Sequence, residues 1–490
     1  MIKIKYSILV KVAIPIAIIS AAAYFCFRAA SLENTNPENY DEQMYTSSSI
    51  VAYHMLFNHH IRKNILLDGW FVAYAQKYSY DINRMPYTQA QWFDNSIWTF
   101  GWKSMAIPKY IMGWFITTFG KDVNPDGYFY RRTDNEKTNK WPGSFAPNDL
   151  IYLARIPNAL LTIISIGLIY LIGVKFFNIY IGTISAFYIL LNNHFIFTNS
   201  NARVSGAATT FSLLTLFLTL LFLKHLYTTS SKLKFYLLSI SIGAATALSV
   251  GSKLNSALII YVFVVYFATF CFIEIKGYFW QKKEVVRIKV KKRKKRKKIY
   301  FVKPYTKRFA IAIVLIGITV FLVFILPNPV LYDKPVLKMV MIKESIEEFF
   351  NIRARALNST HINNSWFVSL WYIIKRNFVR VDSDYFVGTF GNLIDVRFIF
   401  LDLLFFVLGF YYLLKKAISR IRCEYRLEKE SFLLIWVLVM IWGTADFMWI
   451  DWGRYYLPIY NVSCIIIAVG LYQAFLKAII LFHLCFKKAT

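Results

Sequence analysis

An adjacent pair of carboxylic acids, Asp41 and Glu42, is the first feature of the sequence that could carry out chemistry. The pair opens a stretch, 40–60, that we expect to be helical and that follows an apolar run at 7–27. Acids in the first turn of a helix often only cap it and stabilise its dipole. The chemical alternative is a carboxylate at the membrane boundary that acts as a general base on a hydroxyl group.

Four cations stand where apolar runs begin or end: Arg155, Arg203, Lys253 and Arg454. Side chains of this kind commonly extend to water or pair with lipid headgroups, and each of the four fits that interpretation. Several cations on one membrane face also suit the binding of a phosphate group, because they stabilise the negative charge of a leaving phosphate.

Weaker signals mark four further candidates for substrate binding. Asp94 follows two aromatic residues, and Lys109 lies in a second expected helix at 107–119, which Gly120 would end. Tyr455 and Tyr456 follow directly after one of the cations, within the sequence Arg-Tyr-Tyr-Leu-Pro at 454–458.

Membrane-spanning helices must position these residues. The 490 residues are 57% hydrophobic and 17% charged, whereas a soluble protein would be about 45–50% apolar and about 25% charged. The apolar residues occur in blocks of about 20, the length of helix that crosses the hydrocarbon core. This pattern excludes a soluble multidomain enzyme and a disordered or collagen-like chain. We expect an all-α polytopic membrane protein with about ten transmembrane helices, at 7–27, 151–172, 178–197, 207–224, 235–251, 254–275, 309–327, 396–414, 432–449 and 457–476.

The distribution of charge predicts how these spans are oriented. The net charge is +30, and the segment 276–308 holds 16 of the 57 Lys and Arg residues with one acid, Glu284. The segment 28–150 holds 12 basic and 12 acidic residues. Cytoplasmic loops carry an excess of Lys and Arg, so both termini and 276–308 are expected in the cytoplasm. Between two spans, the basic run is better explained by anionic lipid headgroups than by nucleic acid.

The expected organisation follows from these spans and this orientation. It consists of an N-terminal anchor at 1–27, a large outer loop with interfacial helices at 28–150, spans two to six at 151–275, a basic cytoplasmic loop at 276–308, a span at 309–327, a second outer loop at 328–395, and three spans with a short cytoplasmic tail at 396–490. With this topology Asp41, Arg203, Lys253 and Arg454 all fall on the outer face. The orientation was inferred from other residues, so this coincidence favours a shared site.

The order of these motifs resembles that of membrane glycosyltransferases of the C-type superfold, which use a polyprenyl-phosphate sugar donor. Protein O-mannosyltransferases and lipid A aminoarabinose transferases are members of this group. The resemblance extends over roughly 7–476 and rests on short motifs. Asp41-Glu42 with Tyr45 is similar to the family's acidic pair, the segment 108–120 is similar to its interfacial helix, and the segment 155–159 is similar to its R-x-P-x-A motif. Ala202-Arg203 is similar to its outer A-R motif, Lys253 is similar to a lysine that follows a Gly-rich span, and 454–458 is similar to its R-Y-x-L-P ending. The sequence departs from the family at Ala208, where an acid is common, and at 105–108, where a His-Pro-Pro motif is missing.

The resemblance implies an inverting transferase that moves a sugar to an acceptor hydroxyl at the outer or luminal face. Asp41, beside Glu42, would be the catalytic carboxylate, and Lys253, Arg454 and Arg203 would bind the donor phosphate. Fixed cations that neutralise the phosphate make a metal unnecessary, so neither a metal nor a cofactor is expected. The expected partners are the lipid bilayer, a polyprenyl-phosphate sugar and a protein, lipid or glycan acceptor, with no nucleic acid.

Two other functions are compatible with a polytopic chain. A transporter or lipid flippase is disfavoured because the sequence shows no paired inverted halves and no acid in the middle of an expected span. A scaffold protein, recruited through the basic loop 276–308, is the other alternative. The large outer loop 28–150 favours the transferase, because a transferase needs a surface on which to receive its acceptor.

Overall fold

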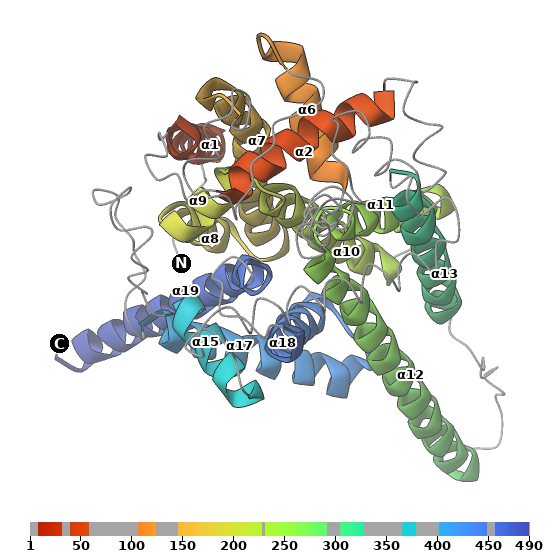
Figure 1. The fold of residues 1–490 in the computed structure, drawn as a ribbon. Helices are drawn as coiled ribbons and strands as arrows, with labels where there is room; N and C mark the ends of the chain where they lie inside the picture. The colour runs from red at the N-terminus through yellow and green to blue at the C-terminus, as the bar shows by residue number, and fades with distance from the viewer. Residues whose placement is uncertain are drawn as a thin grey trace.

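The chain folds into a bundle of helices with two further helices lying across one end (Figure 1). The computed structural model describes residues 8–31, 40–57, 106–123, 146–227, 231–291, 304–327, 365–378, 401–447 and 456–489. These residues form fourteen α-helices and a short 3-10 helix at Leu254–Ala257. The α-helices are α1 (Ile8–Ser31), α2 (Tyr40–Phe57), α6 (Ala106–Phe119), α7 (Asn148–Phe176), α8 (Ile179–Leu190), α9 (Asn193–Ser200), α10 (Ser205–Leu226), α11 (Lys232–Val250), α12 (Leu258–Lys291), α13 (Pro304–Ile325), α15 (Trp366–Phe378), α17 (Leu401–Glu424), α18 (Lys429–Phe447) and α19 (Leu457–Ala489).

Seven helices in the described part of the chain are long and apolar enough to cross a membrane. The number becomes eight if α8 and α9, which are bent by 71° relative to each other, are one span. The protein is therefore a polytopic helical membrane protein, with fewer such helices than the ten spans expected from the sequence. With α8 and α9 counted as one span, the difference lies in α17 and α18, which overlap the spans expected at 396–414 and 432–449. The second half of α17 is rich in Lys and Arg, and α18 has charged residues at both ends.

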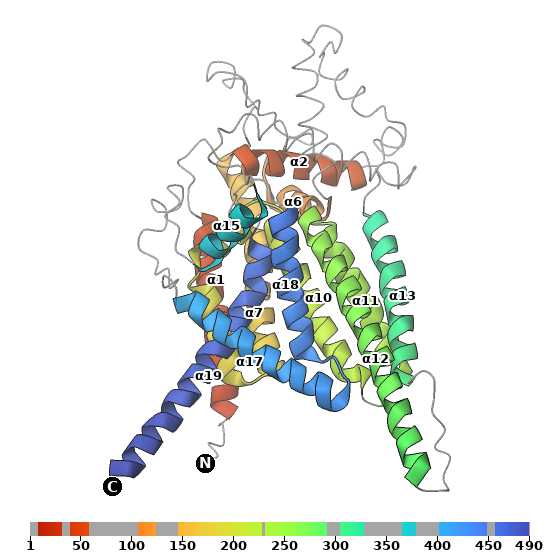
Figure 2. The ribbon, with the colours of Figure 1, turned by 90° about the horizontal axis from the view of Figure 1, so that it is seen from below.

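The two helices predicted in the first large loop are both present. α2 covers 40–57 of the expected 40–60, and α6 begins at Ala106 and ends at Phe119, directly before Gly120. Figure 2 shows α2 lying across the end of the bundle, at a large angle to the long helices and with α6 beneath it. We call this the α2 end. The start of α1 and the ends of α12 and α19 lie at the opposite end, as the alternation of spans predicts (Figure 2).

Close approach of the two backbones fixes how α6 packs on α2. A Cβ atom on residue 113 would lie 2.1 Å from the carbonyl oxygen of Ser49, so only glycine fits at this crossing. Ile50 of α2 packs beside it with Met112 and Ile116 of α6 in a small buried core. α6 is thereby held between α2 and the long helices.

Gly113→Ala is expected to lower the free energy of unfolding by about 1–3 kcal/mol, the usual cost of overpacking a close contact. The matched control is Gly167→Ala in α7, where an added Cβ would have no heavy atom within 4 Å. Alanine favours helix over glycine, so this control should be neutral or stabilising. Thermal unfolding of both variants in detergent measures the difference, and equal midpoints would contradict the tight crossing.

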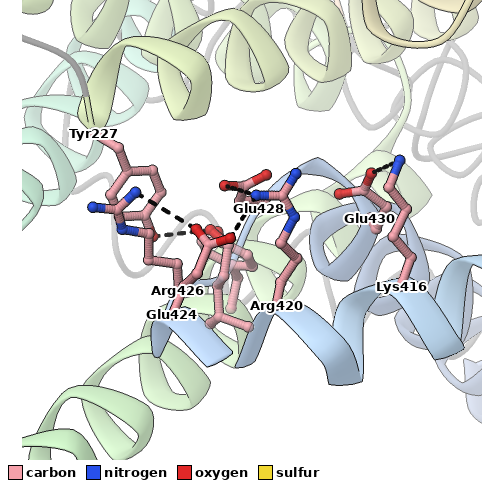
Figure 3. A network of polar contacts seen from close by, with 9 residues as sticks. Tyr227, Lys416, Arg420, Glu424, Arg426, Glu428 and Glu430 are labelled. Carbon is pink, nitrogen blue, oxygen red and sulfur yellow. Dashed lines mark hydrogen bonds and ion pairs between the residues drawn. The ribbon is translucent and has the colours of Figure 1, made fainter. Parts of the chain in front are cut away.

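Ion pairs surround the loop that joins α17 to α18 (Figure 3). They are Arg420–Glu424 at 2.8 Å, Arg420–Glu428 at 3.5 Å, Arg426–Glu424 at 3.7 Å and Lys416–Glu430 at 2.9 Å. Most of these side chains are partly exposed, and exposed ion pairs contribute little to stability. The stronger anchors are the hydroxyl groups of Tyr227 and Tyr266, which both donate to the carbonyl oxygen of Leu427 at 2.9 Å. These two hydrogen bonds attach the loop to α10 and α12.

Candidate functional site

A buried ion pair joins α2 to the long helices at the α2 end. The side chain of Glu42 is 1% exposed, and Arg155 of α7 is 6% exposed. Arg155 donates from Nε to Oε1 of Glu42 at 2.9 Å and from Nη2 to Oε2 at 2.7 Å. Its Nη1 also donates to the carbonyl oxygen of Ala30, the residue before the end of α1, at 3.1 Å. One guanidinium group therefore connects α1, α2 and α7.

This geometry explains why an arginine is tolerated in an apolar helix. A buried charge is costly unless it is paired and its hydrogen-bonding groups are satisfied, and a two-pronged arginine–carboxylate contact meets both needs. The interpretation that Arg155 extends to water is therefore wrong. Glu42 holds the start of α2 in place, and with it the neighbouring residue Asp41, which lies in the first turn of the same helix.

The same carboxylate also fixes the turn that carries Arg203. Oε1 of Glu42 accepts a hydrogen bond from the backbone N–H of Ala202 at 2.8 Å. The amide of Asn158, one turn along α7 from the ion pair, donates to the carbonyl oxygens of Asn201 at 2.7 Å and Arg203 at 2.9 Å. Backbone groups on both sides of residue 202 are therefore bound, and the turn is held next to α2.

The hairpin that carries Lys253 meets the start of α6. The N–H of Ile107 donates to the carbonyl oxygen of Gly251 at 3.4 Å, and the side chain of Lys253 is partly buried. Farther along α6, the sulfur of Met112 accepts from Asn158 at 3.5 Å. α6 therefore contacts both the hairpin of Lys253 and the residue that binds the turn of Arg203.

Two of the predicted substrate-binding residues are buried. Lys109 is 0% exposed, on the inward face of α6, and burial lowers the pKa of its amino group well below the usual range. Tyr456 is 2% exposed, and its carbonyl oxygen accepts from the N–H groups of Ile459 at 3.1 Å and Tyr460 at 3.3 Å. Tyr456 thus starts α19, a structural role that the sequence did not indicate.

The structure brings together part of the predicted site. Glu42, Arg203 and Lys253 lie at the α2 end, together with the helical turn of Asp41. The predicted residues Asp94, Arg454 and Tyr455 lie outside the described residues, as does the side chain of Asp41. Within the described part of the chain, no group of three His, Cys, Asp or Glu side chains could hold a metal ion.

The residue that the sequence analysis missed is Asn158. It lies in the R-x-P-x-A stretch, three residues after Arg155, which places both side chains on one side of α7. That spacing of two polar residues in an apolar helix was an available signal. The described part of this end holds the carboxylate of Glu42 and the cations Arg155, Arg203 and Lys253, and cations can bind an anionic group.

Comparisons with solved structures find proteins of similar fold. The structure is similar to the archaeal oligosaccharyltransferase AglB from Archaeoglobus fulgidus, solved in complex with an inhibitory peptide and a dolichol-phosphate, with a TM-score of 0.51 and 13% identity. The similarity covers 99% of this chain and 52% of AglB, so the chain spans about half of AglB's length. ArnT from Cupriavidus metallidurans, solved with undecaprenyl phosphate, has a TM-score of 0.46 and 13% identity, covering 95% of this chain and 61% of ArnT.

Sequence comparisons find no relative: no protein-family model and no curated protein matches the chain. The similarity is therefore one of fold, at low identity. The chain is a polytopic membrane protein whose fold is similar to that of AglB.

Proposed function

We propose that this protein is an integral-membrane glycosyltransferase that moves a sugar from a polyprenyl-phosphate donor to an acceptor hydroxyl at the outer face of the membrane. The observation that best supports this proposal is that Glu42 accepts hydrogen bonds from both Arg155 and Ala202. It holds the turn of Asp41 at the same end of the bundle as Arg203 and Lys253. The AglB structure, which has a similar fold, contains a dolichol-phosphate, a lipid of the proposed donor class.

The proposed reaction uses a carboxylate as the general base and cations to stabilise the leaving phosphate. Asp41 takes the proton of the acceptor hydroxyl as its oxygen attacks the anomeric carbon from the side opposite the phosphate. The bond from that carbon to the phosphate oxygen breaks, and the configuration inverts. The lipid phosphate leaves with an additional negative charge, which Lys253, Arg203 and Arg454 stabilise. The acceptor is a protein, lipid or glycan.

Glu42 is the less suitable base of the two acids. Both of its oxygens already accept hydrogen bonds from Arg155, and Oε1 also accepts from Ala202. Consecutive helical residues project about 100° apart, so the two acids cannot serve one substrate atom equally. We therefore assign the base to Asp41 and the positioning of its helix to Glu42.

The test is direct transfer by the purified protein in lipid nanodiscs. The protein is incubated with a panel of polyprenyl-phosphate sugars, and release of the free polyprenyl phosphate is followed by mass spectrometry. The proposal predicts that at least one donor is consumed by the parent and not by Asp41→Asn. A parent protein that consumes no donor, with or without added acceptors, would count against a glycosyltransferase.

Removal of the cations should weaken donor binding. Lys253→Met and Arg203→Met are each expected to raise the dissociation constant of the donor about tenfold or more, because hydrogen bonds to charged groups are the strong ones. The matched control is Lys232→Met, at the far end of α11 from the hairpin of Lys253. Binding of a labelled donor measures the effect. If both site variants bind like the control, these residues do not hold the phosphate.

A further inference from the structure

A connected set of polar side chains lies between α8, α17 and α19. The hydroxyl of Tyr188 donates to Oδ2 of Asp402 at 2.7 Å, and Asp402 is 3% exposed, in the first turn of α17. The ring of Tyr188 stacks on Tyr460 of α19, with centroids 6.0 Å apart and an angle of 24°. The amide of Asn192 donates to the hydroxyl of Tyr460. A buried acid among membrane helices is costly, so it marks a place with a specific role.

This set ends at the interruption between α8 and α9. Asn192 stands where the two helices are bent by 71°, and it is the residue before α9 begins. Its Oδ1 accepts from the backbone N–H of Phe195 at 2.7 Å, which caps the new helix. Asn192 therefore connects two partners: its oxygen fixes the first turn of α9, and its nitrogen ties that turn to α19.

The other end of α9 leads directly into the turn of Arg203. α9 has eight residues, so it is about 12 Å long. After it come Asn201 and Ala202, whose backbone groups are bound by Asn158 and Glu42. α9 is thus a short helix with polar anchors at both ends, and it directly connects Asn192 to the turn of Arg203.

We propose that Tyr188, Asp402 and Tyr460 are positioning residues, which act through α9 to set the position of the turn that carries Arg203. This proposal rests on the proposed function, in which that turn binds the donor phosphate. It assigns to the C-terminal helices α17 and α19 a part in building a site whose described residues all precede α12.

The test uses Tyr188→Phe, which keeps the stacked ring and removes the hydroxyl that binds Asp402. The KM for the donor is expected to rise about fivefold, the effect of one hydrogen bond, with a smaller change in kcat. The N–H of Ala202, which donates to Glu42, is expected to exchange with deuterium faster than in the parent. The matched control is Tyr180→Phe, also in α8, whose ring stacks on Tyr472 of α19 with centroids 5.8 Å apart. It should change neither quantity.

A purely structural role gives a different result. It predicts a lower thermal midpoint, with the parent's KM and the parent's exchange rate at Ala202 in the folded protein, and that outcome would overturn the proposal. If Tyr188→Phe does not fold, Asp402→Asn takes its place, and the same two readouts must shift in the same direction. The exchange measurement needs no enzymatic activity. A parent that transfers no sugar would therefore defeat the proposed function, while exchange at Ala202 still decides whether α9 transmits the change.

Discussion

Replacement of Asp41 by asparagine is expected to abolish sugar transfer while donor binding persists. Asparagine keeps the shape of the side chain and cannot accept the proton of the acceptor hydroxyl. The loss of a general base costs about 10²–10⁴-fold in rate. Donor binding rests on the cations, so the dissociation constant should stay close to the parent's. The measurement pairs a sugar-transfer assay with labelled-donor binding on the same preparation.

The variant Glu42→Gln tests which of the two adjacent acids is the general base. Glutamine still offers one oxygen to Arg155 and Ala202 but removes the charge that pairs with the guanidinium group. We expect a less stable protein whose folded fraction still transfers sugar. If Asp41→Asn turns over like the parent while folded Glu42→Gln is inactive, the base has been assigned to the wrong acid. Full activity of both variants would exclude the mechanism.

Removal of Arg155 should give the largest loss of stability. Arg155→Met leaves the carboxylate of Glu42 buried without its charged partner, and breaking a buried pair costs about 3–5 kcal/mol. The double variant Glu42→Met with Arg155→Met removes both charges and should be clearly more stable than the sum of the two single losses predicts. Denaturant unfolding of the three variants in detergent measures this coupling. Simple additivity would show that the two side chains do not interact in the folded protein.

Local patterns predicted the elements at the α2 end well. The helices at 40–60 and 107–119 could be located because the signals that mark them lie within or directly beside each helix. These signals are an acidic first turn, an apolar face and a glycine after the last residue. The placement of the start of α1 and the end of α19 opposite the α2 end also followed, from the alternation of the expected spans. These predictions required no knowledge of which helices are neighbours.

Features that depend on tertiary neighbours could not be predicted in this way. Arg155 and Glu42 are 113 positions apart, and the sequence alone made an exposed arginine equally reasonable. In the sequence, Asn192 lies within an apolar run that predicts one continuous helix. The break at this residue could not be predicted, because its partner Tyr460 lies 268 positions away. Asp402 lies in the first turn of α17 and accepts a hydrogen bond from Tyr188, which is 214 positions away.

The contacts of Glu42 set an order in which the protein can be assembled during synthesis. Ala30 and Glu42 emerge early, but Arg155 follows 113 residues after Glu42, and Ala202 follows 160 residues after it. Contacts of such long range form only after the intervening chain has been made and inserted. The contacts that fix Glu42 in the folded protein therefore form only after α7 and the turn that follows α9 have been synthesised.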